Sequence, residues 1–152
     1  MNTKILGAIA AVALLAACAK EETVATGQGA TASGPVPGSQ EDLVANVGDR
    51  VFFDTSMSNL SQDSQATLTR QAAWLAKFAS VNVQIAGNCD ERGTVEYNQA
   101  LGQRRANAAS SFLKAKGVAV ARIVTISYGK SRATGQDEAG WRMDRNATTS
   151  VR

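Results

Sequence analysis

The sequence predicts an α/β fold of the α+β type, a two-layer sandwich in which helices cover one face of a small mixed sheet. Three observations lead to this prediction. The chain has 152 residues, which allows one modest domain with attached segments. Strand and helix signals alternate in the order βαβαβ after residue 47, and a weaker strand signal follows them at the C-terminus. Parallel neighbours joined through these helices are expected to cross over right-handedly.

The strand signals are short apolar runs bounded by turn residues. Residues 81–86 alternate between apolar and mostly polar side chains, which is the period of a half-buried strand, and Gly87 ends this run. We expect strands at 51–54, 81–86 and 123–128, and an edge strand at 148–152.

Two longer segments have the period of amphipathic helices. In residues 61–79 the apolar side chains recur at helical spacing, and Ser61 is placed as the N-cap. Thr94 is placed to cap a second, longer helix that reaches Lys116 and stops at Gly117.

Residues 1–17 are predicted to be a secretory signal peptide, because Lys4 precedes an apolar run that ends in small residues. This run is shorter than the roughly 20 residues that span a bilayer. Residues 15–18, Leu-Ala-Ala-Cys, resemble the bacterial lipobox, which implies a diacylglyceryl thioether and an N-acyl chain on Cys18. Ordinary secretory cleavage beside an incidental cysteine is the alternative. By the same resemblance, Ala19 directs a lipoprotein to the outer membrane.

Residues 18–46 are expected to form the lipidated N-terminus and a flexible tether. They are rich in small and polar residues and contain both prolines of the chain, Pro35 and Pro37. A coil of this length has a root-mean-square reach of roughly 30 Å. The folded domain is then predicted over residues 47–152.

The composition excludes several kinds of chemistry. The chain has no histidine, which removes imidazole-based catalytic triads and histidine zinc sites. Its two cysteines cannot form a four-thiolate metal site, and no base adjoins Cys89, so we expect Cys89 to be a small semi-buried residue and not a nucleophile. We therefore expect no enzyme, no metal, and no cofactor besides the acyl chains on Cys18.

Charge is unevenly distributed along the chain. Residues 19–91 have nine acidic and four basic side chains, whereas residues 92–152 have eleven basic and four acidic ones. Aromatic residues in the basic half are few and far apart, which argues against a nucleic-acid partner. An anionic cell-wall or membrane surface fits this half better.

Candidate binding residues lie where the second strand gives way to the second helix. Asp90 follows the strand end, and Asn98, Leu101 and Arg105 fall on one helix face, since seven residues at 100° each return to within about 20° of the same direction. A carboxylate accepts hydrogen bonds from an ammonium, and a guanidinium matches a carboxylate, so this pair suits a zwitterion. The same spacing allows a stabilising ion pair between Asp90 and Arg105 without a ligand.

The segment Gly87-Asn88-Cys89-Asp90-Glu91-Arg92-Gly93-Thr94, with its continuation to Ala106, closely resembles the motif of the OmpA-like C-terminal domain family. The similarity begins at residue 47 and extends through 127–130 to 144–145. Together with the lipobox, it fits the lipoprotein branch of that family. The resemblance implies noncovalent binding of diaminopimelate, which belongs to the peptide stem of peptidoglycan.

By motif position, the resemblance assigns five residues to peptidoglycan binding. Asp90 is expected to hold the ammonium of diaminopimelate, and Arg105 its carboxylate. Thr94 and Asn98 are expected to add hydrogen bonds, and Asp54 matches a further pocket position. The free N–H groups at the start of the helix favour the anion.

The resemblance also implies a cellular role. It predicts a lipid-anchored protein of the outer membrane that faces the periplasm, works in the Tol system in envelope integrity and cell division, and has TolB and other Tol proteins as partners. The alternative is an envelope lipoprotein whose domain only binds proteins such as TolB and whose wall pocket is weakened.

Three departures from the family pattern bear on that alternative. Asn88 stands where the family commonly has histidine, Asn146 stands where it has a second arginine, and Ser56 stands where an acidic residue often follows the first strand. These departures leave the predicted fold intact and bear on affinity and partner contacts.

Overall fold

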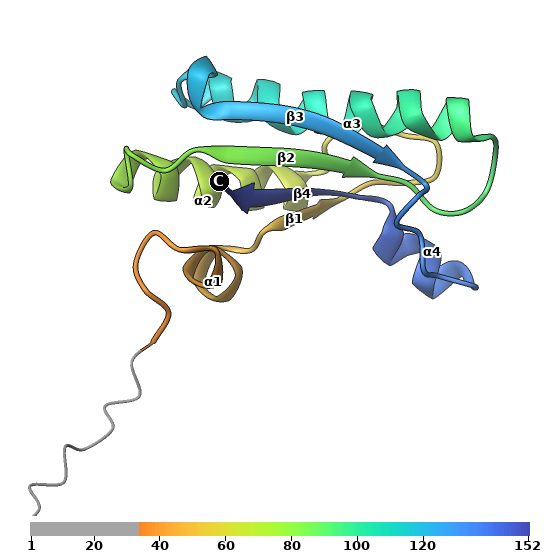
Figure 1. Ribbon diagram of the computed structural model, residues 1–152, viewed down its shortest axis with the longest axis horizontal. Coiled ribbons are helices and arrows are strands. Elements are labelled where there is room, and N and C mark those ends of the chain that lie inside the picture. Colours follow the sequence, from red (N-terminus) through yellow and green to blue (C-terminus); the bar gives the residue numbers. More distant parts are fainter. Residues whose placement is uncertain (1–33) are drawn as a thin grey trace, which may run out of the picture. The chain divides into compact units, whose positions relative to one another are not determined.

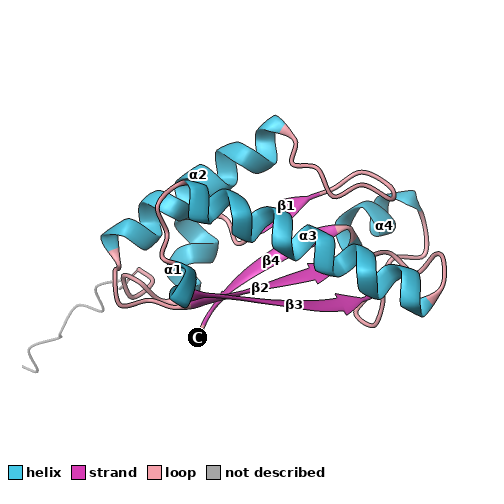
Figure 2. Ribbon diagram, turned by 90° about the horizontal axis from the view of Figure 1, so that it is seen from above, coloured by secondary structure: helices cyan, strands magenta, loops and turns pink. Residues whose placement is uncertain are grey.

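The computed structural model describes residues 34–152; the predicted signal peptide, Cys18 and the first part of the predicted tether lie outside the described residues. Four strands form one sheet in the order β1-β4-β2-β3. Helices α2 (Gln62–Lys77) and α3 (Val95–Ala115) cover one face of this sheet (Figure 1, Figure 2), which confirms the predicted two-layer sandwich. The strands are β1 (Arg50–Phe52), β2 (Val83–Asn88), β3 (Ile123–Gly129) and β4 (Asn146–Val151).

The sheet is mixed, and its C-terminal strand is interior. β2 and β3 are parallel and joined through α3, whereas β4 runs antiparallel to both β1 and β2. The expectation of an edge strand at the C-terminus is therefore wrong. Thr149 is buried and donates a hydrogen bond to Gln71 of α2, while Thr148 and Ser150 are partly exposed. A polar strand can lie inside this sheet because the second face of an antiparallel sheet can remain solvated.

Both predicted helix caps are present. Ser61 Oγ accepts a hydrogen bond from the main-chain N–H of Ser64, and Thr94 Oγ1 accepts one from that of Tyr97. Gly117 ends α3 with a φ of 96°, a left-handed conformation that glycine adopts without steric cost.

A short helix, α4 (Glu138–Asp144), precedes β4 and was not predicted. Asp137 caps it by accepting a hydrogen bond from the N–H of Gly140 at 2.8 Å. Seven residues are too few for a helical period to be recognised in the sequence, which explains the omission.

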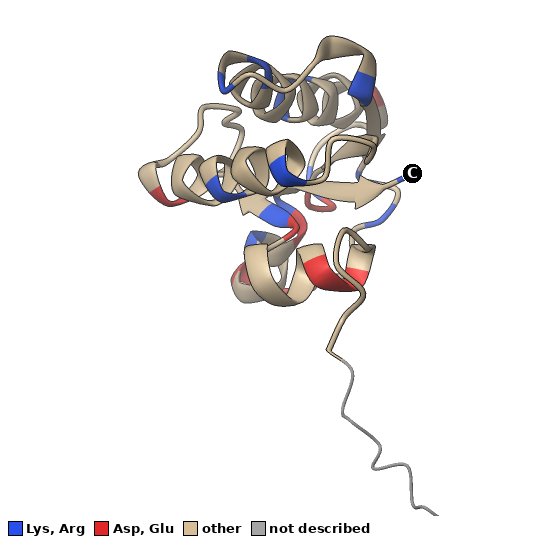
Figure 3. Ribbon diagram, turned by 90° about the vertical axis from the view of Figure 1, so that its left-hand side faces the viewer, with Lys and Arg blue, Asp and Glu red and all other residues tan. Residues whose placement is uncertain are grey.

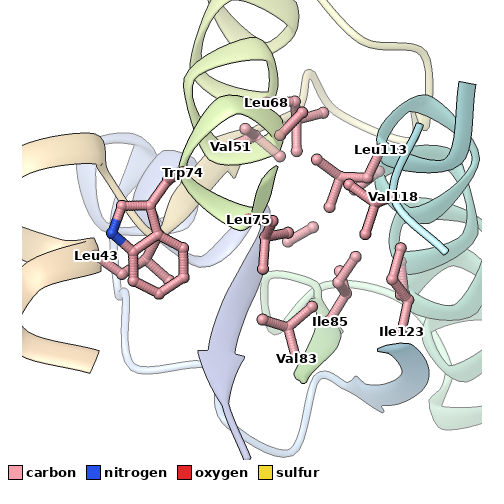
Figure 4. Close-up of a cluster of buried hydrophobic side chains, with 14 of the residues drawn as sticks. Leu43, Val51, Leu68, Trp74, Leu75, Val83, Ile85, Leu113, Val118 and Ile123 are labelled. Carbon is pink, nitrogen blue, oxygen red and sulfur yellow. The ribbon is translucent and has the colours of Figure 1, made fainter. Parts of the chain in front are cut away.

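The hydrophobic core lies between the two long helices and the sheet. Leu68 and Leu75 of α2, Val83 and Ile85 of β2, and Leu113 of α3 are fully buried at its centre (Figure 4). Complete burial of a side chain of this size contributes about 1.5–3 kcal/mol, so this layer is the main source of the domain's stability.

The folded domain begins earlier than predicted. Residues Gln40–Asp42 form helix α1, and Leu43–Val47 form a π-helical turn. Leu43 is completely buried beside Trp74 of α2 (Figure 4), so residues 40–46 belong to the domain and the predicted tether boundary at residue 46 is wrong. The sequence did not indicate this helix, because Leu43 is a single buried apolar residue in a mostly polar stretch and produces no helical period.

Asp42 fixes this N-terminal segment on α2. Its carboxylate accepts hydrogen bonds from Gly38 N at 2.8 Å, from Asn46 Nδ2 at 2.7 Å and from Trp74 Nε1 at 2.9 Å. These bonds, led by that of Gly38, hold the pKa of Asp42 below its ordinary value.

Helix α3 and strand β2 approach each other most closely at two glycines. A Cβ atom on Gly87 would overlap the carbonyl oxygen of Gly102, and a Cβ atom on Gly102 would overlap Ser127 Oγ. This contact holds the end of β2 against the first half of α3, which are the two segments that supply the predicted binding residues.

The topology mixes the acidic and basic halves of the sequence. β4, from the basic half, lies between β1 and β2, from the acidic half. Figure 3 shows basic and acidic residues on the same side of the molecule. Within residues 34–152, no helix is both long and apolar enough to cross a membrane.

Candidate functional site

A pocket of about 140 Å³ opens where β2 ends and α3 begins. It is formed by the turn after β1, the loop after β2 and the first half of α3. Three of the five predicted binding residues, Asp90, Asn98 and Arg105, lie together in its lining. The lining consists of Thr55, Ser56, Cys89, Asp90, Arg92, Gly93, Tyr97, Asn98, Leu101 and Arg105.

The carboxylate of Asp90 is paired with two arginines. Its Oδ2 lies 2.7 Å from Arg92 Nη2 and 3.2 Å from Arg145 Nη1, and its Oδ1 lies 3.2 Å from Arg92 Nε. Burial alone would raise the pKa of Asp90, but the hydrogen bonds from Arg92 and Arg145 outweigh burial and hold this pKa below its ordinary value. The group is therefore an anion suited to a cation. Helical spacing allowed an ion pair between Asp90 and Arg105, but the structure pairs Asp90 with Arg92 and Arg145 instead.

Arg105 is completely buried and fastens three segments together. Its Nε donates to Met57 O at 2.9 Å, its Nη1 to Asn88 O at 2.8 Å and its Nη2 to Asp54 O at 3.0 Å. The guanidinium also lies over the ring of Phe53, 5.2 Å from its centroid. Burial lowers the pKa of Arg105, but an arginine side chain stays charged in proteins.

These contacts leave Arg105 a limited capacity for a ligand. A guanidinium has five N–H groups, and three bonds to main-chain carbonyls leave two of them. Arg105 therefore serves first to position the pocket walls, and it adds a positive charge beside the pocket.

Asn98 and Thr94 organise the loop that carries Asp90. Asn98 is buried, and its Nδ2 donates to the carbonyl oxygens of Arg92 at 2.7 Å and Thr94 at 3.0 Å. Thr94 caps α3 and lies outside the pocket lining. Both residues thus hold the loop between β2 and α3 in one conformation.

Asp54 and Ser56 occupy different places in the turn after β1. The side chain of Asp54 is exposed and does not line the pocket; its main-chain oxygen holds Arg105. Ser56 lines the pocket with a φ of 58°. A non-glycine residue in this left-handed region costs about 1–3 kcal/mol, so strain is stored at the pocket.

Cys89 is more deeply buried than the predicted semi-buried position. It is 1% exposed, and its Sγ lies 3.4 Å from Asn98 O. Burial raises the pKa of this thiol, which keeps it protonated and supports a structural role.

Two residues that pair with Asp90, Arg92 and Arg145, were not predicted from the sequence. Arg145 donates to Asp90, to Glu138 Oε1 at 2.9 Å and to Phe53 O at 3.2 Å. Arg92 bonds Asp90 from two residues away, so local spacing could have identified it, whereas Arg145 comes from the distant start of β4 and gave no local signal.

The fold and this pocket define a class: a small α/β domain with an ionised, nearly buried carboxylate in an open pocket, suited to binding a cationic or zwitterionic ligand. The family model described as the OmpA family matches residues 52–147, and the chain belongs to this family.

The relatives of this chain have a consistent description. It is 48% identical over 140 residues to the peptidoglycan-associated lipoprotein of Rhizobium meliloti (strain 1021), which covers 89% of this chain and 80% of that protein. It is 45% identical over 152 residues to the protein of the same name from Mesorhizobium japonicum, which covers 97% of this chain and 90% of that one.

A solved structure shows the same fold. The crystal structure of the peptidoglycan-associated lipoprotein from Burkholderia pseudomallei matches with a TM-score of 0.65 and 39% identity, over 68% of this chain and 90% of that one. The names of these relatives describe a lipoprotein associated with peptidoglycan.

Proposed function

We propose that this chain is an outer-membrane lipoprotein that tethers the membrane to peptidoglycan without catalysing a reaction. Acyl chains on Cys18 hold it in the membrane, and its domain binds diaminopimelate of the peptide stem noncovalently at the pocket of Asp90. Each buried methylene contributes about 0.8 kcal/mol, so several chains on one residue give persistent anchoring. The lipobox resemblance and the names of the relatives support this anchor.

The observation that carries the proposal is the ionised, nearly buried carboxylate of Asp90 beside an open pocket at the start of α3. A ligand ammonium pairs with this carboxylate. The ligand carboxylate then lies near the charge of Arg105 and near the start of α3, where the N–H groups of Val95 and Glu96 have no acceptor within the helix.

We extend the proposal to the partners of this surface. The similarity to peptidoglycan-associated lipoproteins supports a place in the Tol-Pal system, with TolB competing for the same surface and with a role in envelope integrity and cell division.

Sedimentation with isolated cell walls tests the proposal. The full-length lipoprotein, held in detergent, is expected to sediment with diaminopimelate-type sacculi, and lysine-type wall is expected to compete poorly with these sacculi for the protein. Asp90→Asn keeps the shape of the side chain and removes its charge. It is expected to weaken retention at least tenfold, since loss of one partner of a desolvated charge pair costs about 2–5 kcal/mol.

The matched control is Asp63→Asn, an exposed aspartate in the first turn of α2, which is expected to leave retention unchanged. Equal retention of the Asp90→Asn protein and the wild type rejects the proposed site. Failure of the wild type to sediment, combined with capture by TolB, favours the rival function of a domain that binds only proteins.

A further inference from the structure

Two arginines share the carboxylate of Asp90, and they differ in how firmly they are held. The side chain of Arg145 is 6% exposed, and it is fixed by Phe53 O and Glu138 as well as by Asp90. The side chain of Arg92 is 39% exposed and belongs to the loop between β2 and α3. The half-exposed guanidinium of Arg92 can move into solvent and stay hydrated, whereas the buried guanidinium of Arg145 would be stranded without its partner, which costs much more free energy. Arg92 is therefore the partner that can leave.

Arg92 occupies the position that an incoming cation needs. It uses both oxygens of Asp90, with Nη2 at 2.7 Å from Oδ2 and Nε at 3.2 Å from Oδ1. Arg145 takes a further position on Oδ2 at 3.2 Å. A ligand ammonium placed on Asp90 beside both guanidinium groups would meet two like charges at close range, so the ligand and the Arg92 side chain exclude each other.

We propose that Arg92 is an internal stand-in for the ligand's ammonium, and that ligand binding requires the Arg92 guanidinium to leave Asp90. This inference rests on the proposed function of the pocket. The displaced side chain has a place to go, because Arg92 already stacks on the Trp141 ring, 4.2 Å from its centroid, and lies 3.7 Å from Glu138 Oε2. Its main-chain N–H remains on Asp90 Oδ1 at 3.2 Å and keeps the carboxylate aimed at the pocket.

The stand-in sets a threshold that every ligand of Asp90 must overcome. An internal guanidinium competes at the high effective concentration of a tethered group, so a ligand with an ammonium alone displaces it poorly. A ligand that adds a carboxylate contact on the Arg105 side of the pocket gains enough free energy to displace it. Because both kinds of ligand need the position of the Arg92 guanidinium, Arg92 lowers the affinity for each by the same factor. Only a ligand with the additional carboxylate contact then keeps a useful affinity.

Calorimetric titration of the full-length lipoprotein with meso-diaminopimelate and with n-butylamine tests this inference. Arg92→Ala is expected to bind diaminopimelate at least about fivefold more tightly, a factor that corresponds to the upper range for an exposed ion pair, because the Asp90 side of this pair is nearly buried. The affinity for n-butylamine is expected to rise by the same factor, since both ligands need the position of the Arg92 guanidinium. Arg92→Lys keeps a cation in the loop and is expected to fall between the wild type and Arg92→Ala. Arg104→Ala, an exposed arginine of α3, is the matched control and is expected to bind like the wild type.

A structural readout accompanies the titration. The side-chain Nε–H resonance of Arg92 is expected to move on addition of diaminopimelate, while that of Arg145 retains its hydrogen bond. If the wild type binds and Arg92→Ala binds equally or more weakly, the stand-in is overturned and the proposed function stands. If neither protein binds diaminopimelate and the wild type does not sediment with sacculi, both are overturned.

Discussion

Asn88 Nδ2 donates a hydrogen bond of 2.8 Å to Asn146 Oδ1, which joins the end of β2 to the start of β4. These two residues are also two of the positions at which the chain departs from the pattern of its family. Asn146 Nδ2 donates in turn to Met143 O at 2.7 Å, and this bond fixes the orientation of the Asn146 amide. The two departures thus form one polar contact within the fold.

The hydrogen bond between Asn88 and Asn146 predicts that substitutions at these two residues have coupled effects on the free energy of unfolding. Asn146→Ala is expected to lower the free energy of unfolding by about 1–3 kcal/mol, because it removes the acceptor of Asn88 Nδ2 and the donor of Met143 O. Asn88→Ala is expected to cost less, because Thr148 Oγ1 still donates to Asn146 Oδ1 and because Asn88 Oδ1 accepts no hydrogen bond within residues 34–152. The double variant is expected to lose less than the sum, by about 0.5–3 kcal/mol. Urea denaturation of the four proteins measures this difference, with the exposed Asn107→Ala as the control. Simple additivity would contradict the coupling.

Arg105 is predicted to be a residue of stability as well as of binding. Arg105→Ala leaves three main-chain carbonyls of the pocket walls without their donor, and we expect a loss of at least about 3 kcal/mol in the free energy of unfolding. Arg105→Lys retains one charge and fewer donors and is expected to be intermediate. Thermal unfolding monitored by circular dichroism tests both, with Arg104→Ala as the neutral control. A stable Arg105→Ala protein would show that these bonds contribute little.

The close contact of α3 with β2 makes Gly102 intolerant of a side chain. Gly102→Ala is expected to destabilise the domain although alanine favours helices, because the new methyl group would lie 2.8 Å from the main-chain oxygen of Gly87 in β2 and would overlap Ser127 Oγ of β3. We expect a loss of about 1–3 kcal/mol in the free energy of unfolding, measured in urea. Gly117→Ala separates steric overlap from backbone strain. No atom lies within 4 Å of a Cβ at Gly117, so the cost of this substitution comes only from the positive φ. A Gly102→Ala protein as stable as the wild type would show that α3 can move away from β2.

Acid sensitivity follows from Asp90. Its pKa is lower in the folded state than in the unfolded chain, so its stabilising contribution is complete above the unfolded value of about 3.9 and is lost as the pH falls through the folded value. We expect the free energy of unfolding of the wild type to fall below about pH 4, and to fall less steeply in Asp90→Asn. Asp63→Asn is the control. Equal slopes for the wild type and Asp90→Asn would contradict the assigned pKa direction.

Most of the fold could be predicted because its signals are local. The caps at Ser61 and Thr94 depend on neighbours within one turn. The alternation in residues 81–86 predicted a strand, which lies two residues later at Val83–Asn88 and is buried along most of its length. The errors concern features set by distant contacts. The polar strand β4 is interior because one sheet face stays open, and residues 40–46 are folded because Leu43 packs beside Trp74.

The place of the candidate site in the fold could be predicted from the sequence, but the hydrogen-bond partners of Asp90 and Arg105 could not. Helical spacing correctly brought Asn98, Leu101 and Arg105 to the pocket with Asp90. It could not show that Arg105 is satisfied by main-chain carbonyls, nor that Arg145 reaches Asp90 from the start of β4. Such partners depend on how the chain closes in three dimensions.

A crystal soaked in meso-diaminopimelate tests the central claim most directly. We predict that the compound occupies the pocket with its ammonium hydrogen-bonded to the Asp90 carboxylate and its carboxylate on the Arg105 side, near the first turn of α3. An empty pocket with the compound ordered elsewhere on the protein, or a bound compound that leaves Asp90 untouched, would contradict the account.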